Sequence, residues 1–271
     1  MKFRDACKAE LIITGDEILF GRILDTNSNW IAKRLVELGA TLRRVTVVGD
    51  DLTDIGLSLK EALRRENDVI IFTGGLGPSS DDLTVQALSR TLNREIELDP
   101  DTVEKINEVY RRRGIEDSDR GLRMARILEG ADPIRNPVGF SVGMRLVERG
   151  RWIFTLPGIP EEMKSMFDHS IAPVIEDYGA GRLVARTVVV RMVWKDFFPL
   201  YREMQDDFKQ IYIKNAATPP QEEERHKVHG IKVDIVVRGE TREEADQVMD
   251  EFLEEYQRRI ELAGGGEIVP C

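Results

Sequence analysis

The feature that most constrains the fold of this chain is an apolar run that leads directly into a glycine-rich turn. Residues 69–72 read Val-Ile-Ile-Phe, and the chain continues as Thr73-Gly74-Gly75-Leu76-Gly77-Pro78-Ser79-Ser80-Asp81-Asp82. Such a run is typical of a strand that is buried on both faces of a sheet. Three glycines in four positions let backbone N–H groups approach one point without obstruction by Cβ atoms. The sequence therefore predicts a site for an oxyanion such as phosphate at the end of a buried strand.

Two carboxylates at the same turn complicate a simple phosphate site. Asp81 and Asp82 follow the glycines, and helical periodicity is predicted from about residue 82 to residue 92. Carboxylates repel a phosphate unless a divalent cation lies between the two groups. In an alternative that needs no ligand, the two aspartates cap the helix and complement its dipole, which contributes about 1 kcal/mol.

The first part of the chain has the pattern of an α/β domain. From residue 9 to about residue 179, short β-rich runs alternate with longer segments of helical periodicity. This alternation is typical of a parallel sheet that is covered by helices on both faces. The small residues in Tyr178-Gly179-Ala180-Gly181 indicate a linker. We therefore predict two domains, at residues 1–179 and 180–271.

The second predicted domain is a small α+β unit. Its order is strand, helix, strand, strand, helix, in segments at residues 187–193, 196–208, 211–214, 231–237 and 241–262. This order fits a split β-α-β arrangement, provided that another part of the chain supplies a first or last strand.

Charge and hydropathy exclude several classes of function. The 271 residues carry a net charge of −10, and residues 111–113 are the one basic cluster, which argues against nucleic-acid binding. No apolar run of about 18 residues predicts a membrane span, and the first residues lack the apolar core of a signal peptide. The two cysteines and three histidines show no metal-binding spacing. We therefore expect a cytoplasmic protein that binds neither nucleic acid nor membrane.

Polar residues follow each of the first three predicted strands. They are Gly15-Asp16-Glu17 after residues 10–14, Gly49-Asp50-Asp51 after residues 42–48, and the glycine-rich turn after residues 69–72. Ligands of open α/β sheets bind at the carboxyl ends of the strands, so these residues are expected to meet at one rim. Carboxylates beside an anion-binding turn suit a diphosphate bridged by Mg²⁺ or Mn²⁺. The combination favours diphosphate hydrolysis or nucleotidyl transfer.

The acidic residues of this rim also have interpretations without a ligand. Asp50 and Asp51 suit an N-cap pair for the next helix, and Asp16 with Glu17 suits a turn before a helix. The segment Asp25-Thr26-Asn27 is either an ordinary helix start or a contact to a base or ribose. Two common nucleotide motifs are missing from the sequence, because the turn lacks the third glycine of GxGxxG and no GxxxxGK[ST] occurs. A standard NAD site and a P-loop ATPase are therefore not expected.

Several motifs together resemble one protein family. They are Thr73–Thr84, Gly15-Asp16-Glu17-Ile18-Leu19, Asp25-Thr26-Asn27, Val48-Gly49-Asp50 and Leu156-Pro157-Gly158-Ile159-Pro160-Glu161-Glu162-Met163. Over about residues 10–178 the chain resembles the competence/damage-inducible protein A (CinA) family. The resemblance implies a three-layer α/β domain with a mostly parallel sheet and the molybdopterin-binding (MoaB/Mog-like) fold. The second unit resembles the small domain of stand-alone, archaeal-type members.

The resemblance also implies an activity and the residues that carry it. Relatives act on dinucleotide pyrophosphates such as ADP-ribose, or FAD, with a divalent metal (Mg²⁺, Mn²⁺ or Co²⁺), and they form homodimers. Asp82 and Asp50 match acidic positions of the catalytic pocket, and the expected metal ligands are Asp82, Asp81 and Glu17. The expected substrate and phosphate contacts are Gly15, Asn27, Thr73, Gly74, Gly75, Gly77, Pro78, Ser79, Asn136, Gly139, Pro157 and Gly158.

Two departures from the family pattern matter. Long bacterial members carry a further domain that hydrolyses the amide of nicotinamide mononucleotide, and this chain ends where that domain would begin, so deamidase activity is not expected. Where many members read Asn-Pro-x-Gly-Thr-Ala-Pro-Gly, this chain reads Asn136-Pro137-Val138-Gly139-Phe140-Ser141-Val142-Gly143. We expect Phe140 to alter the width of the pocket or to offer a stacking face.

Three functional hypotheses follow from the sequence. The leading one is a hydrolase, a metal-dependent nucleotide pyrophosphatase that converts ADP-ribose or a related adenine dinucleotide to AMP. The second is a module that binds molybdopterin, or another pterin phosphate, at the same turn. The third is a regulator that binds a nucleotide without turning it over.

Overall fold

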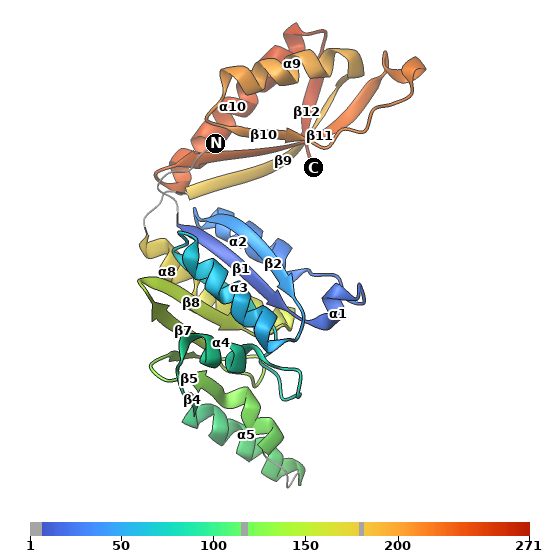
Figure 1. The fold of residues 1–271 in the computed structure, drawn as a ribbon. Helices are drawn as coiled ribbons and strands as arrows, with labels where there is room; N and C mark the ends of the chain where they lie inside the picture. Colours follow the sequence, from blue (N-terminus) through green and yellow to red (C-terminus); the bar gives the residue numbers. More distant parts are fainter. Residues whose placement is uncertain (1–6, 115–118, 179–181) are drawn as a thin grey trace. The chain divides into compact units, whose positions relative to one another are not determined.

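The computed structural model describes residues 7–114, 119–178 and 182–271 (Figure 1). Contacts divide the described chain into two compact units, the first with residues 7–35 and 40–178 and the second with residues 36–39 and 182–271. The expected linker residues Gly179, Ala180 and Gly181 lie outside the described residues, as do residues 1–6 of the first predicted domain.

The first unit is built on a six-stranded, mostly parallel sheet. Its order is β2 (Thr41–Val48), β1 (Lys8–Thr14), β3 (Val69–Thr73), β8 (Arg151–Leu156), β7 (Gly143–Glu148) and β6 (Asp132–Ile134). The first four strands are parallel, and β7 and β8 form an antiparallel hairpin. Arg149 and Gly150 make the two-residue turn of this hairpin, and both have positive φ, as a type I′ turn requires. All five residues of β3 are buried, as the unbroken apolar run predicts.

Helices cover both faces of this sheet, which confirms the three-layer α/β prediction (Figure 1). On one face α3 (Leu52–Arg64) and α4 (Thr84–Leu92) pack in one apolar cluster with β1, β3, β7 and β8. On the other face α2 (Asn27–Glu37) lies against α7 (Pro160–Ser170), where Trp30 and Phe167 meet edge to face at 5.5 Å. The chain bends at Ile171 before α8 (Ala172–Asp177), which carries Pro173 in its first turn.

The shorter elements of the first unit were not predicted. They are α1 (Asp16–Leu19), β4 (Ile96–Leu98), α6 (Asp119–Leu122), the 3₁₀ turn Arg123–Ala125, β5 (Arg126–Leu128) and β6 (Asp132–Ile134). Each is only three or four residues long, which is too short to display a helical or strand period. The longer helix α5 (Pro100–Arg113) begins with Pro100 and ends at Gly114 in the left-handed conformation, as expected.

The second unit is a four-stranded antiparallel sheet with two helices. Its elements are β9 (Arg182–Val193), α9 (Trp194–Asp207), β10 (Tyr212–Asn215), the 3₁₀ turn Glu222–Glu224, β11 (Val228–Gly239), α10 (Arg242–Leu262) and β12 (Gly266–Pro270). The strand order is β10-β11-β9-β12, and both helices belong to the same apolar cluster as the sheet. The strand that the pattern lacked is therefore β12, at the end of the chain. The interpretation as a small α+β unit is confirmed.

The two cysteines lie in different surroundings. Cys7 is buried beside the start of β1, and burial followed by the nearby charge of Asp68 raises the pKa of its thiol to about 12. Cys271 is exposed. Across the described residues, every helix is too short or too polar to cross a lipid bilayer.

Candidate functional site

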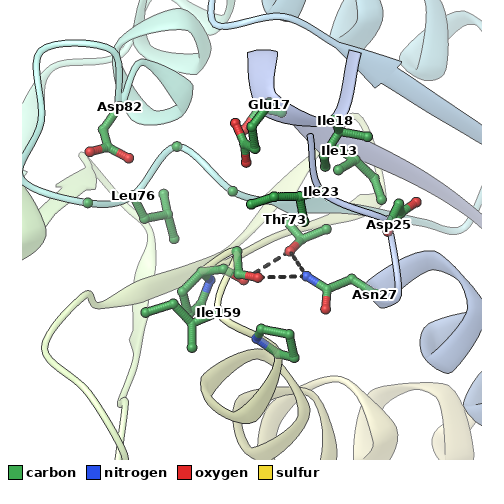
Figure 2. Close-up of a pocket in the computed structure, with 18 of the residues that line it drawn as sticks. Ile13, Glu17, Ile18, Ile23, Asp25, Asn27, Thr73, Leu76, Asp82 and Ile159 are labelled. Atoms are coloured by element: carbon green, nitrogen blue, oxygen red, sulfur yellow. Dashed lines mark hydrogen bonds between the residues drawn. The ribbon is translucent and has the colours of Figure 1, made fainter. Parts of the chain in front are cut away.

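A pocket of about 470 Å³ opens at the carboxyl ends of β1 and β3 (Figure 2). The strand order β2-β1-β3 reverses between these two strands, and that reversal leaves a crevice where ligands of open α/β sheets bind. The predicted residues that line it are Gly15, Glu17, Asn27, Asp50, Thr73, Gly74, Gly75, Gly77, Ser79, Asp81, Asp82, Pro157 and Gly158. The structure thus brings together thirteen positions that are spread over five segments of the sequence.

The glycine turn depends on glycine at two positions. Gly74 and Gly75 have φ values of 105° and 66°, a backbone region that side chains disfavour. A Cβ atom on Gly74 would lie 2.4 Å from the carbonyl oxygen of Thr14, and one on Gly75 would lie 2.3 Å from Oγ1 of Thr84. The turn therefore packs directly against the end of β1 and the start of α4.

Two buried threonines hold this turn in place, and neither was predicted. The hydroxyl of Thr84 donates to the carbonyl oxygen of Gly74 at 2.8 Å. The hydroxyl of Thr14 lies 3.2 Å from that of Thr84, and since the Thr84 proton is already used, Thr14 is the donor. Thr14 ends β1 after the apolar run at residues 11–13, which is a signal that the sequence did contain, whereas Thr84 follows a mostly polar segment and gives no such signal.

The turn offers backbone donors to a ligand. Gly74 donates its N–H to the carbonyl oxygen of Leu156 at 3.0 Å, and Thr84 donates to that of Gly75 at 3.2 Å. No described residue accepts a hydrogen bond from the N–H groups of Gly75, Leu76 or Gly77. Successive unpaired N–H groups in a glycine turn are the donors that commonly bind an anion.

The carboxylate of Asp82 belongs to the turn. Its Oδ2 accepts a hydrogen bond from the N–H of Ser79 at 2.7 Å, and its own N–H donates to the carbonyl oxygen of Ser79 at 3.3 Å. A Cβ atom on Gly77 would lie 2.6 Å from the same Oδ2, so the carboxylate rests against the glycine backbone.

The helix-cap interpretation of Asp81 and Asp82 is therefore wrong. Helix α4 begins at Thr84 and not near Asp82, its N-cap residue is Leu83, and no side chain caps it. The pKa of Asp81 is lowered mainly by a hydrogen bond from the Ser79 side chain, with help from Arg123. The helix starts late because residues 79–82 form a loop of their own, closed by the two Ser79–Asp82 hydrogen bonds.

Asp50 faces the pocket from the end of β2. It exchanges hydrogen bonds with Asp16: the Asp16 N–H donates to Oδ2 of Asp50 at 3.0 Å, and the Asp50 N–H donates to Oδ1 of Asp16 at 3.3 Å. Burial raises the pKa of Asp50, as do the charges of Asp16, Glu17 and Asp81. The next residue, Asp51, caps α3 by accepting from two N–H groups of its first turn. The predicted cap role therefore belongs to Asp51 alone.

Asn27 joins three segments of the pocket wall. Its Nδ2 donates to the carbonyl oxygen of Gly158 at 2.9 Å and to Oγ1 of Thr73 at 3.3 Å, as the dashed lines in Figure 2 show. The Thr73 hydroxyl in turn donates to the carbonyl oxygen of Pro157 at 2.9 Å. Nearby, Asp25 accepts from the N–H of Ser28 at 2.9 Å, so the helix-start interpretation holds for Asp25.

Three of the predicted contacts do not line the pocket, namely Pro78, Asn136 and Gly139. Asn136 donates from Nδ2 to the carboxylate of Glu162 at 2.6 Å, and Glu162 does line the pocket. Sequence reasoning missed Glu162 because an acid in the first turn of a helix has an ordinary explanation in the helix dipole. Phe140 is also absent from the lining, and its ring lies 5.4 Å from the ammonium nitrogen of Lys105.

Ser141 also lines the pocket, in a Gly-x-Ser-x-Gly sequence at residues 139–143. In a serine hydrolase this pattern places the nucleophile on a strand-to-helix turn. Here Ser141 precedes strand β7, and no described histidine hydrogen-bonds to it. The serine is therefore not arranged as a hydrolase nucleophile.

Apolar side chains form the remaining wall of the pocket. Ile23 and Ile159 are both 58% exposed, and Figure 2 shows them in separate segments of the pocket wall. The full apolar set is Ile13, Ile18, Ile23, Leu24, Leu76 and Ile159. A pocket with both a polar turn and exposed apolar residues suits a ligand that has a phosphate end and an organic end.

The carboxylates of the pocket do not form a ready metal site by themselves. Within residues 7–114, 119–178 and 182–271, no three acidic, histidine or cysteine side chains group closely enough to hold an ion. Figure 2 shows Glu17 and Asp82 at separate positions along the glycine turn. Mg²⁺ is commonly held by one or two carboxylates together with substrate phosphates, so these residues fit an ion that binds with its substrate.

Comparisons with known proteins agree with this architecture. Residues 10–177 match the family model described as "Probable molybdopterin binding domain". A protein of Aeropyrum pernix is 34% identical over 260 residues, 95% of each chain, and one of Pyrococcus furiosus is 42% identical over 218 residues, 78% of this chain and 84% of its own. A crystal structure of a protein CinA of unknown function from Thermoplasma acidophilum is 34% identical, with a TM-score of 0.57, and covers 63% of this chain and 99% of its own.

These matches confirm the predicted fold of the first unit and extend the likeness to a full-length relative. The family match covers more than half of the chain and contains the whole pocket. The chain therefore belongs to the family of proteins with the "Probable molybdopterin binding domain".

Proposed function

We propose that the first unit is a metal-dependent pyrophosphatase that hydrolyses ADP-ribose or a related adenine dinucleotide, such as FAD, to AMP. One observation carries the proposal: a single pocket combines the unpaired N–H groups of the glycine turn with the carboxylates of Glu17, Asp50, Asp81 and Asp82. The helix-cap alternative accounted for two of these carboxylates, and the structure removes it. The likeness to the protein CinA supports assignment to that family.

In this proposal, backbone N–H groups bind the phosphate and carboxylates bind the metal. The N–H groups of Gly75, Leu76 and Gly77 bind one phosphate of the substrate, because they are the unpaired donors of the turn. Asp82 binds the metal, with Asp81 or Glu17 as a second ligand, since hard oxygen ligands suit Mg²⁺, Mn²⁺ and Co²⁺. When bound, the ion neutralises phosphate charge and lowers the pKa of a coordinated water.

In the same proposal, Asp50 accepts the proton of the attacking water. Its pKa is raised by burial and by three neighbouring carboxylates, which makes it a better proton acceptor than an ordinary exposed aspartate. Attack of water on one phosphorus breaks the bridging P–O bond and yields AMP and ribose 5-phosphate from ADP-ribose. The exposed apolar wall then accommodates the organic part of the substrate.

A second candidate function is the binding of a pterin phosphate such as molybdopterin. The match of residues 10–177 to a molybdopterin-binding domain favours it. In this case the same N–H groups bind the pterin phosphate, and no diphosphate bond is broken. A homodimer stays a prediction for either function, and light scattering of the purified protein tests it.

The experiment is hydrolysis of ADP-ribose with Mn²⁺, Mg²⁺ or Co²⁺, followed by chromatography of AMP. Asp82→Asn keeps the size of the side chain but removes its charge, so we expect AMP release to fall by at least about a hundredfold. Asp206→Asn makes the same change at an exposed residue of α9 and is expected to keep full activity. Full activity of Asp82→Asn, with folding unchanged, would refute the assignment. Binding of a pterin phosphate without any turnover would favour the second candidate.

A further inference from the structure

Glu162 differs from the other acidic residues of the pocket in its burial. It is 8% exposed, although it lines the pocket from the first turn of α7. No described lysine, arginine or histidine forms an ion pair with it. Burial of a carboxylate without a cation is costly, so such a group usually has a partner that the protein alone does not provide.

Asn136 is the one described donor to this carboxylate. Its Nδ2 lies 2.6 Å from Oε2 of Glu162, whereas Oε1 receives no hydrogen bond from a described residue. An ionised carboxylate has about four acceptor positions, so most of its hydrogen-bonding capacity is unused. Oε1 is not fully enclosed by protein atoms, and Glu162 lines the pocket, so this oxygen is accessible to a ligand from the pocket.

The loop at residues 136–141 is shaped around Glu162. A Cβ atom on Gly139 would lie 2.3 Å from Oε1 of Glu162, so the backbone passes directly over the carboxylate. Oδ1 of Asn136 accepts the N–H of Gly139 at 2.8 Å, and the ammonium group of Lys105 donates to the carbonyl oxygens of Asn136 and Gly139 at 3.1 and 2.7 Å. These contacts fix one orientation of the carboxylate.

The helix dipole does not explain this burial. Glu161, the preceding residue in the same first turn, is exposed and already supplies a negative charge to the start of α7. Glu162 lies in the same short segment as Ile159, which is exposed and lines the apolar wall of the pocket. The carboxylate is therefore placed beside the wall that suits the organic end of a ligand.

We propose that Glu162 recognises the organic part of the ligand by accepting hydrogen bonds from two adjacent neutral donors. Two ligand groups have this chemistry: the vicinal hydroxyls of a ribose and the N3–H with the 2-amino group of a pterin. The inference rests on the proposed function, in which the glycine turn binds the phosphate. It makes Glu162 a specificity-determining residue, and Asn136 and Gly139 positioning residues that act through it.

The test compares three probes on the full chain by titration calorimetry in EDTA, so that no turnover occurs. Inorganic pyrophosphate has neither donor pair, ADP-ribose has ribose hydroxyls, and 6-hydroxymethylpterin diphosphate has the pterin edge. Glu162→Gln is the variant, and Glu161→Gln is the matched control, because it removes the same charge one residue away from an exposed position. We expect Glu162→Gln to weaken one of the two organic ligands by at least about tenfold and to leave pyrophosphate within about twofold.

The outcomes separate the inference from the proposed function. A selective loss for ADP-ribose identifies the ribose hydroxyls as the donors, and a selective loss for the pterin diphosphate identifies the pterin edge. If all three probes bind and Glu162→Gln weakens neither organic ligand relative to pyrophosphate and to Glu161→Gln, the inference is wrong and the phosphate site stands. If the native protein binds none of the probes in EDTA, the titrations are repeated with Mg²⁺, because the proposed ion binds together with its substrate. Failure to bind any probe with Mg²⁺ as well overturns the proposed function, and the inference with it.

Discussion

Asp50 and Asp51 are adjacent in the chain, yet their pKa values are shifted in opposite directions. Partial burial raises the pKa of Asp50. The negative charges of Asp16, Glu17 and Asp81 raise it further. Asp51 turns to the start of α3 and accepts from the N–H groups of Asp54 and Thr53, which lowers its pKa. Of these two neighbouring residues, Asp50 thus belongs to the pocket and Asp51 to the helix cap.

We expect Asp50→Asn to stabilise the protein at neutral pH. A raised pKa means that the folded state binds the proton more tightly than the unfolded state, so ionisation of Asp50 costs stability as pH rises. The gain in the midpoint of thermal unfolding should be full at pH 7 and should vanish below about pH 4, where both states are protonated. Calorimetric scans across this range measure it. A variant that is less stable than the native protein at pH 7 would contradict the prediction.

Asp51→Ala should have the opposite effect. A lowered pKa means that Asp51 stabilises the fold above its unfolded-state pKa, and this contribution is lost as pH falls through the folded-state pKa. The variant is therefore expected to unfold at a lower temperature at pH 7. The difference should begin to shrink near pH 4 and should be lost only at lower pH, once the pH has fallen through the lowered folded-state pKa. Asp51→Asn is the control, because asparagine is an equally good N-cap and should restore part of the loss.

Gly75→Ala should destabilise the protein more than a glycine substitution with similar backbone geometry elsewhere. Gly75 and Gly150 have φ values of 66° and 74°, so both substitutions carry the cost of a left-handed residue, about 1–2 kcal/mol. Only the Cβ on Gly75 meets a neighbour, Oγ1 of Thr84, whereas the one on Gly150 has open space. Denaturant unfolding should show an excess loss of at least about 1 kcal/mol for Gly75→Ala. Equal losses in the free energy of unfolding would mean that the turn shifts to accommodate the added methyl group.

Thr84→Val should weaken both the fold and the anion site. The change removes the donor to the carbonyl oxygen of Gly74 and the partner of the Thr14 hydroxyl, which leaves buried polar groups unpaired at a cost of about 1–3 kcal/mol. Thr84→Ser keeps the hydroxyl and is expected to retain most of the stability. The readouts are the free energy of unfolding and the affinity for pyrophosphate. Unchanged pyrophosphate affinity in Thr84→Val would show that the threonine does not shape the turn.

Metal removal should abolish hydrolysis and leave the fold intact. Since no three ligating side chains group together in the described part of the chain, the fold does not depend on an ion. EDTA is therefore expected to stop AMP release while the midpoint of thermal unfolding changes by less than about 1 °C. A large fall in that midpoint would reveal a structural metal.

The local parts of this fold were readable from the sequence because they depend on local chemistry. The apolar run at residues 69–72 predicted a buried strand, and all five residues of β3 are buried. A glycine after a helical segment is typical of a left-handed helix end, and Gly114 has that conformation after α5. The grouping of polar residues at one rim could also be predicted from the sequence. Three parallel strands with polar residues at their carboxyl ends place those residues at one edge of the sheet.

The remaining parts depend on contacts between distant segments. Strand β12 begins at the last of three consecutive glycines and becomes a strand only because Gly266 to Pro270 pair with β9, which no local pattern indicates. Helix α4 starts late because a side chain two residues before it bonds to Ser79. Glu162 looks like an ordinary helix-terminal acid until the Asn136 loop, 26 residues earlier in the chain, is seen to cover it.

The contrast between the two thiols has a practical consequence for work in solution. With its pKa near 12, Cys7 carries almost no thiolate at pH 8, and its burial shields it from reagents. Cys271 stands in solvent. A maleimide dye therefore attaches at one defined position of the native sequence, and fluorescence experiments can begin without any prior removal of cysteines.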